Sequence, residues 1–492
     1  MIFALVLLPA LAGLLAFALP KPALRRGVLI GTAIIHAALT AICWKFSPAP
    51  TLNEWLALDA AGLLFLSITS GLFLLASIYA AGYLSQEANR KFTDIEEGLL
   101  FDNAPEAVFI GCLLLFLSAM TLVTVSQHFG LLWVAIEGTT LASAPLIYFH
   151  RHHRSLEATW KYLLICSVGI ALALLANFFL GVAAVNSSGE NFPIVLPALL
   201  VHAHDLQTPW LKAACILFFV GYGTKMGLAP LHTWLPDAHS EAPSVISALL
   251  SGAVLNCAFL GLLRVQQIFV GAGMEQFTRD IWIALGVASL VISAIFIIGQ
   301  TDYKRLLAYS SVENMGILAL GIGLGAAGAF GALLHAINHS LVKAMLFLLA
   351  GNILARYQTK NISNVRGLLN ATPVTGALWL AGFLAITGTP PFGPFLSKFT
   401  ILKAALDLGH GYVVIATIFL ATLGIIFVGM ATAFLGMAQG EPEKVTIATN
   451  DSKWQIAPPL VLGAMVLWLG INVPEPLANL LKQIASTLGG AQ

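Results

Sequence analysis

Charged side chains stand inside segments that are otherwise apolar enough to cross a membrane. Lys225 lies within the apolar run 211–235 and Glu137 within the run 130–149, each well clear of the ends of its run. A charge at bilayer depth costs roughly 2.5–3.5 kcal/mol on insertion scales, so such residues usually mark ion or proton paths. A carboxylate and an ammonium group that lie close together favour each other's charged form. We therefore predict that Glu137 and Lys225 act as a pair in a proton path.

Both residues also have structural interpretations. A lysine can carry its charged head to the membrane surface along an apolar stem, but Lys225 lies too far from either end of its run. A protonated glutamate can form a hydrogen bond between two helices, and this alternative stays open for Glu137.

Three proton-binding side chains recur at four-residue spacing in the apolar run 327–355. His335, His339 and Lys343 stand at i, i+4 and i+8 in the string GALLHAINHSLVKAMLFLLAG. This spacing places them along one face of a single helix. A metal site would need cysteine or carboxylate ligands close by, and none are evident. The row favours a proton relay, with histidines that only pack between helices as the structural alternative.

Glycine and proline interrupt two of the apolar runs. Gly227 and Pro230 interrupt the run that contains Lys225, and the segment 388–394 interrupts another run just before Lys398. Such breaks free backbone carbonyls inside a membrane span, and transporters place their sites at them. We expect Lys225 and Lys398 to occupy corresponding places in two halves of the chain.

Weaker candidates could line the ends of such a path. Three follow the first break and could line an access route from the cytoplasm, or simply form a polar loop: His232, His239 and Glu241. Glu313 lies early in the apolar run 306–325 and could continue the polar row. Lys403 stands five residues after Lys398 and could line an exit.

Composition indicates a polytopic membrane protein. Apolar residues form 58% of the chain and charged residues 10%, with a mean hydropathy of +0.88, as in proteins with many membrane spans. The net charge of +1 gives no argument for a nucleic-acid partner. The five cysteines stand singly, without metal-ligand or redox spacing. Since no cofactor motif and no soluble domain are evident, we expect no cofactor in this chain.

A window of about 20 residues predicts an all-α protein with fourteen membrane spans. They are expected near 2–19, 27–46, 60–84, 106–126, 129–149, 158–185, 210–235, 243–270, 280–299, 306–325, 327–355, 371–406, 411–438 and 456–473. One membrane domain covers 1–492. Its expected parts are three N-terminal helices in 1–105, five-helix units in 106–270 and 278–438, and a last helix at 456–473. A second five-helix unit must be inverted relative to the first, so discontinuous helices 7 and 12 indicate inverted repeats.

Basic residues are unevenly distributed between the two sides of this topology. With the N-terminus outside, the cytoplasmic loops contain fourteen of the 24 Lys and Arg residues, including Lys21, Arg151 and Lys360. The positive-inside rule therefore places both termini on the non-cytoplasmic side.

Several strings resemble the antiporter-like subunits of respiratory complex I, of Mrp-type cation/proton antiporters and of membrane-bound nickel–iron hydrogenases. The strings are GYGTKMGLAPLHTWLPDAHSEAP, AYSSVENMG, HAINHSLVKAMLFLLAG and TGTPPFGPFLSKF. The resemblance covers essentially all fourteen expected spans. HSEAPSVISALLSGAVLN and IEGTTLASAPLIYFHRHHRSLEATWKYLL are most similar to the F-type subunit of the hydrogenase-4 and formate hydrogenlyase group.

The resemblance implies two inverted five-helix repeats and a polar axis along the membrane plane. It implies roles in proton translocation for Glu137, Lys225, His335, His339, Lys343 and Lys398. Many members carry a lysine or histidine in the eighth span, where this chain has Ser251 and Asn256, so the central link would need water. Asn314 likewise stands where many relatives have histidine.

The implied function is proton translocation within a redox-driven complex of the bacterial or archaeal inner membrane. The implied partners are other membrane subunits and a cytoplasmic redox arm, which would carry any nickel–iron or iron–sulfur groups. Two alternatives stay open: an Mrp-like sodium or potassium/proton antiporter subunit, and a structural membrane subunit that does not pump.

Overall fold

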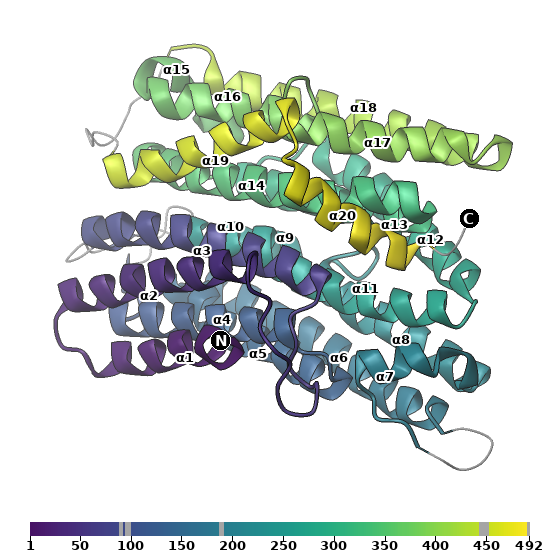
Figure 1. Ribbon diagram of the computed structural model, residues 1–492. Helices are drawn as coiled ribbons and strands as arrows, with labels where there is room; N and C mark the ends of the chain where they lie inside the picture. Colours follow the sequence, from purple (N-terminus) through teal and green to yellow (C-terminus); the bar gives the residue numbers. More distant parts are fainter. Residues whose placement is uncertain (88–91, 94–99, 186–190, 442–451, 490–492) are drawn as a thin grey trace.

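The computed structural model describes residues 1–87, 92–93, 100–185, 191–441 and 452–489. Over these residues the chain is almost entirely helical, and its long helices run side by side in one bundle (Figure 1). Within the same residues, eleven helices are long and apolar enough to span a membrane, and two shorter apolar helices accompany them. The chain is therefore a multi-pass membrane protein, as its composition predicts.

The part of the bundle drawn lowest in Figure 1 is formed by the first 271 residues. Its helices are α1 (Ile2–Ala18), α2 (Pro22–Cys43), α3 (Ala60–Glu87), α4 (Glu106–Val125), α5 (Phe129–Ile147), η1 (Tyr148–His150), α6 (His153–Ala183), α7 (Leu196–Val201), η2 (Ala203–Asp205), α8 (Thr208–Met226), α9 (Leu235–Glu241), α10 (Ser244–Leu249), η3 (Leu250–Val254) and α11 (Leu255–Gly271). Two short antiparallel strands lie between α3 and α4: β1 (Phe92–Thr93) and β2 (Leu100–Phe101).

The remaining helices pack above them in the same view. They are α12 (Glu275–Ile297), α13 (Tyr303–Gly323), α14 (Gly325–Tyr357), η4 (Ile362–Asn364), α15 (Leu368–Ala371), α16 (Pro373–Thr387), α17 (Gly393–Asp407), α18 (His410–Ala438), α19 (Lys453–Ile471) and α20 (Glu475–Leu488). The interior helices α13 and α14 bury almost every residue, whereas α18 and α19 expose many apolar side chains, as expected of helices that face lipid.

Both helix breaks predicted from glycine and proline are present. Helix α8 ends because Gly227 adopts a left-handed conformation with φ +79°, and α16 ends because Gly388 does so with φ +84°. Glycine reaches this conformation at little cost because it has no Cβ atom. The chain resumes as α9 and α17, so each break leaves two half-helices inside the bundle.

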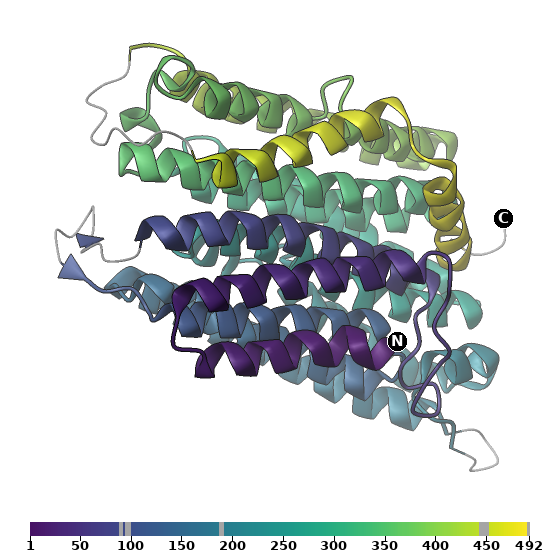
Figure 2. The same cartoon turned by 60° about the vertical axis from the view of Figure 1, so that its left-hand side comes forward.

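Several helical segments lie outside the predicted spans, among them α9, η4 and α15. Helices α7 and η2 lie between the predicted spans 158–185 and 210–235. Helix α20 follows the last predicted span and escapes a hydropathy window because it is amphipathic: it buries one apolar face and exposes a polar one. It lies across the ends of the long helices, at the same end of the bundle as the N-terminus (Figure 2).

Glycines allow neighbouring helices to approach closely. A Cβ atom added at Gly286 of α12 would lie 2.8 Å from the backbone nitrogen of Leu320 and 2.9 Å from the carbonyl oxygen of Gly316 in α13. A Cβ atom at Gly221 of α8 would lie 2.7 Å from the Cβ atom of Ala173 in α6. Small residues at such contacts are typical of helix pairs in membranes. These glycines let α12 approach α13, and α8 approach α6, backbone to backbone.

We predict that Gly286→Val destabilises the bundle, because the new side chain would collide with the backbone of α13. Overpacking of this kind costs about 1–3 kcal/mol, which should lower the thermal unfolding temperature of the purified protein in detergent. Gly181→Val is the matched control, since a Cβ atom there meets nothing within 4 Å. Equal unfolding temperatures for the two variants would contradict the close α12–α13 contact.

Candidate functional site

Lys225 lies in the last turn of α8, immediately before the first helix break, and is fully buried. Its ammonium group donates to Oγ1 of Thr140 in α5 (2.8 Å) and to the hydroxyl of Tyr162 in α6 (2.6 Å). It also lies 4.5 Å from the centre of the Tyr162 ring. Positive charge is favoured near helix C-termini, where carbonyl groups lack partners. The break therefore gives a buried lysine a stabilising environment.

Glu137 lies on α5, one turn before Thr140, so both residues occupy the same side of this helix. It is only partly buried, and its Oε1 accepts a hydrogen bond from Ser167 of α6 (2.9 Å). No ion pair within 4 Å joins Glu137 to Lys225 among the described residues. The ammonium group of Lys225 donates instead to Thr140. Direct pairing of the two charges stays a prediction.

The relay predicted on α14 lies in the centre of the bundle, and all three of its side chains are fully buried. His335 bridges two helices, with Nδ1 2.9 Å from Oγ of Ser397 in α17 and Nε2 2.8 Å from Oδ1 of Asn314 in α13. Lys343 donates to Oγ of Ser310 (2.6 Å) and to a backbone carbonyl of α13. Neither ring nitrogen of His339 has a hydrogen-bond partner in the described part of the chain.

Lys398 forms an ion pair with a residue that the sequence ranked among the weaker candidates. Its ammonium group lies 3.0 Å from Oε1 of Glu313 in α13, and both side chains are at least 94% buried. It also donates to the carbonyl of Ile386, near the end of half-helix α16 (3.0 Å). The second break therefore holds a lysine whose counter-charge is in direct contact.

A helical irregularity lies between α10 and α11, in the predicted eighth span. The segment η3 is a π-helical turn between α10 and α11, and Ser251 within it lies 2.8 Å from Ser311 of α13 (Oγ to Oγ). Asn256 of α11 donates to Oγ of Ser340 in α14 (2.7 Å). π-Turns inside α-helices are frequent at functional sites. Ser251 and Asn256 thus connect this segment to α13 and α14, respectively, through groups that do not titrate.

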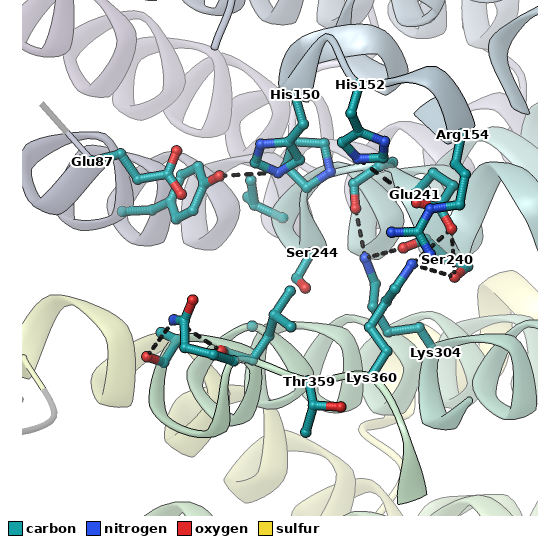
Figure 3. Close-up of a pocket in the computed structure, with 18 of the residues that line it drawn as sticks. Glu87, His150, His152, Arg154, Ser240, Glu241, Ser244, Lys304, Thr359 and Lys360 are labelled. Carbon is teal, nitrogen blue, oxygen red and sulfur yellow. Dashed lines mark hydrogen bonds and ion pairs between the residues drawn. The ribbon is translucent and has the colours of Figure 1, made fainter. Parts of the chain in front are cut away.

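A pocket of about 160 Å³ lies where α3, α9, α13 and α14 end (Figure 3). We call it the basic pocket. The charged and histidine side chains along its wall include His150, His152, Arg154, Glu241, Lys304 and Lys360. Glu241 pairs with Lys360 (2.7 Å) and lies 3.8 Å from Nε2 of His152, while Lys304 donates to the carbonyls of Ser240 and Ala242.

The charge state of Glu241 is set by its neighbours in this pocket. Burial acts to raise the pKa of its carboxyl group, but the positive charge and the hydrogen bond of Lys360 outweigh burial and lower the pKa to about 2. Glu241 is therefore an anion at neutral pH that contacts Lys360 in the loop after α14 and lies close to His152 before α6.

The other weak candidates lie in different surroundings. His239 of α9 is fully buried and stacks on Phe347 (ring centres 5.1 Å apart), and the ammonium group of Lys343 lies 5.4 Å from the same ring. His232 lies in the first break, 6.2 Å from the ring of Tyr309. Lys403 forms an exposed ion pair with Asp407 (2.5 Å), and its place at an exit stays a prediction.

No group of three or more His, Cys, Asp or Glu side chains is arranged to hold a metal ion within the residues that the structure describes. The five cysteines are free and buried, and no two of them are bonded.

A family model described as NADH:quinone oxidoreductase/Mrp antiporter, transmembrane, matches residues 126–424. This segment is more than half of the chain and contains Glu137, Lys225, the relay helix and Lys398. The chain belongs to this family. The membership confirms the resemblance seen in the sequence motifs.

Relatives within the family include components of hydrogenase-4. The hydrogenase-4 component F homolog of Methylacidiphilum infernorum is 37% identical over 346 residues, which are 69% of this chain and 69% of that protein. Hydrogenase-4 component B of Escherichia coli is 27% identical over 397 residues, which are 78% of this chain and 56% of that protein.

Solved structures with the same fold come from larger membrane complexes. A chain of respiratory complex I from Thermus thermophilus matches with a TM-score of 0.81 and 24% identity, over the whole of both chains. A chain of the Mrp complex from Dietzia sp. matches with a TM-score of 0.83 and 20% identity, over 99% of this chain and 97% of that one. These matches establish that the fold is shared.

The motifs did not indicate the hydroxyl groups that hold the buried charges. Thr140, Tyr162, Ser310 and Ser397 each contact a predicted residue, yet single hydroxyls in apolar spans are too common to stand out. A usable signal would have been their spacing: Thr140 lies one turn after Glu137 on the same helix.

We predict that Glu313→Gln lowers the thermal stability of the purified protein, because it leaves the buried ammonium group of Lys398 without its counter-charge. Removing one partner of a buried ion pair costs about 3–5 kcal/mol. The double variant Glu313→Gln/Lys398→Met should lose less than the sum of the two single variants. Strictly additive losses of unfolding temperature would contradict direct pairing.

The contribution of Glu241 to stability should depend on pH. Its pKa in the folded protein is about 2, below the ordinary value of 4.5, so this contribution is complete above about pH 4.5 and is lost as the pH falls towards 2. We expect Glu241→Gln to unfold at a lower temperature than the wild type near pH 6, and the difference to shrink near pH 3. A difference that does not change with pH would show that the carboxylate charge is not what stabilises the pocket.

Proposed function

We propose that this chain is the proton-translocating membrane subunit of a redox-driven complex related to hydrogenase-4 and complex I. One observation carries the proposal: ionisable side chains occur inside both parts of the bundle, partly buried Glu137 and buried Lys225 in the first, and the buried row on α14 with Lys398 in the second. Hydroxyl and amide groups of α6, α11 and α13 contact these side chains or the helix α14 that carries the row. Charged groups are retained inside a membrane bundle chiefly where ions or protons pass.

The proposed topology has fourteen spans and two inverted repeats, 106–270 and 278–438. The placement of charges supports this division. Each unit would carry a glutamate on its second helix, Glu137 on α5 and Glu313 on α13, and a lysine beside the break of its fourth helix, Lys225 and Lys398. Because the two five-helix units would be inverted relative to each other, the two glutamate–lysine pairs would lie at comparable depths measured from opposite surfaces of the membrane.

The end of the bundle that contains the basic pocket would face the cytoplasm of a bacterial or archaeal cell. Arg154, Lys304 and Lys360 gather there, whereas the N-terminus and α20 lie at the opposite end (Figure 2). This distribution supports both termini on the non-cytoplasmic side under the positive-inside rule.

Protons would reach the relay from the basic pocket through His239. This histidine is two residues before Glu241, and neither of its ring nitrogens has a partner in the described part of the chain. Its ring and the ammonium group of Lys343 share Phe347 as a neighbour. Water that bridges His239, His339 and Lys343 would complete the path, since a side chain passes a proton only to a group within hydrogen-bond distance.

The Glu137–Lys225 pair would act as the gate. When the carboxylate lies close, it favours the ammonium form of Lys225; when it withdraws or is neutralised, Lys225 more readily gives its proton to the relay. Glu137 is well placed to respond to a neighbour, because it is partly exposed beside Val134 and Leu141, which are 51% and 62% exposed. A neighbouring membrane subunit at this face would couple its own state to the gate.

Energy for pumping would come from other subunits, since no cofactor-binding motif is evident in this sequence. The proposed partners are further membrane subunits and a cytoplasmic arm that transfers electrons and carries any metal clusters. The hydrogenase-4 names of two relatives support this assignment over a self-contained transporter.

We predict that Lys225→Ala and Glu137→Gln each abolish proton pumping by the assembled complex while electron transfer and assembly persist. Proton uptake by inverted membrane vesicles, driven by the redox substrate, measures pumping. Lys212→Ala is the matched control because Lys212 lies near the start of the same helix α8, over the ring of Phe277 and away from the proposed path. Pumping at the wild-type rate in either gate variant would refute the proposal that Glu137 and Lys225 act as a pair.

The same vesicles distinguish the alternatives. An Mrp-like antiporter subunit would exchange Na⁺ or K⁺ for protons without any redox substrate. A purely structural subunit would tolerate neutralisation of Lys225, Lys343 and Lys398 with pumping intact. Either result would contradict the proposed function.

A further inference from the structure

An apolar cavity of about 240 Å³ lies on the lipid-facing side of the bundle, away from the polar path. It is lined by residues of α3, α14 and α19, by Trp44 at the end of α2, and by Pro474 and Leu477 at the start of α20. We call it the apolar cavity. The polar groups in its wall are few: the hydroxyl of Ser67 already accepts a hydrogen bond from Nε1 of Trp44 (2.9 Å). An apolar cavity without free hydrogen-bonding groups does not hold water.

The shape of the apolar cavity follows one face of α3. Its wall on this helix consists of positions at helical spacing: Leu64, Ser67, Ile68, Gly71, Leu72 and Leu75. The eleven residue steps from Leu64 to Leu75 extend for about 16 Å at 1.5 Å per residue. This length is close to half of a hydrocarbon core about 30 Å thick. The cavity thus runs parallel to the spans, through a single leaflet.

The ends and sides of the apolar cavity show how it would be filled. Trp44 of α2 and Pro474 and Leu477 before and within α20 lie at its outer end, where the amphipathic helix crosses the bundle. Tryptophan is enriched at this level of a membrane. Met465 and Trp468 of α19 are 40% and 53% exposed at its side, so it opens towards the bilayer.

We propose that the apolar cavity binds one acyl chain of a membrane phospholipid from the leaflet beside α20. The dimensions favour a chain over a protein segment, because a helix with its side chains is about 10–12 Å across and would not enter a cavity of this volume. The acyl chain would supply the packing contacts that the lining side chains lack, since dispersion attraction needs atoms in contact.

The position of the site gives it a structural consequence. Ile337 and Leu341 form its inner wall on α14, two residues after His335 and His339 respectively. Two residues correspond to about 200° around a helix, so the acyl chain would cover the back of the helix whose other face carries the histidines. The proposal itself stands on the cavity alone and does not depend on proton translocation.

Gly71 provides a sharp test, because a Cβ atom added there meets no protein atom within 4 Å. Gly71→Leu should fill the apolar cavity without disturbing the fold. Gly424→Leu is the matched control: it makes the same change on α18, also in open space and outside the cavity. Gly71→Ala, a smaller change in the same direction, keeps the test valid should the leucine variant fail to fold.

The measurement titrates the delipidated full-length protein in detergent with phosphatidylglycerol that carries brominated acyl chains. Bromine quenches tryptophan fluorescence on contact, and Trp44 and Trp468 line the site. We expect saturable quenching that Trp44→Phe/Trp468→Phe removes, that Gly71→Leu weakens at least tenfold, and that Gly424→Leu leaves unchanged. Quenching that does not saturate, or that is equal in Gly71→Leu and wild type, would overturn the proposal. One further result would overturn the proposal. In it, the complex that contains Gly71→Leu loses a membrane partner subunit, while the quenching of the Gly71→Leu protein is undiminished.

Discussion

The structure depends on one constraint: a charge inside a membrane bundle must have polar partners, since the surroundings cannot solvate it. Each buried lysine meets this constraint in a specific way. At the end of α8, Lys225 donates hydrogen bonds to two hydroxyl groups. Lys343 donates to a hydroxyl and a carbonyl group of α13. At the second break, Lys398 donates to a carboxylate and a carbonyl group. The two half-helix ends and the close helix contacts follow from this requirement, because they bring these partners within reach.

The two halves satisfy the constraint differently. In the second half, Glu313 and Lys398 are in direct contact, whereas in the first half Glu137 is bonded to Ser167 and Lys225 to Thr140 and Tyr162. The glutamates and lysines nevertheless stand on corresponding helices of the proposed units. The structure thus contains a direct glutamate–lysine contact at the second break, and a glutamate and a lysine with separate hydroxyl partners near the first.

Sequence reasoning identified the residues that carry charge but not what they contact. Lys225, Lys343 and Lys398 stand out because a charge in an apolar run is rare, and both helix breaks follow from Gly227 and Gly388. The Glu313–Lys398 pair depends on how α13 packs against α17, which no local pattern encodes. Helix α20 was missed because a hydropathy window averages its two faces, and the apolar cavity because lipid-facing and cavity-lining leucines look alike in sequence.

The central claim is that a hydrated row of polar groups joins the two halves inside the bundle. A cryo-electron microscopy map of the assembled complex, at a resolution that shows water, tests it most directly. The account predicts ordered water at the ring nitrogens of His339 and between Lys225 and Ser251. Dry apolar packing in the interval between Lys225 and Lys343 would contradict it.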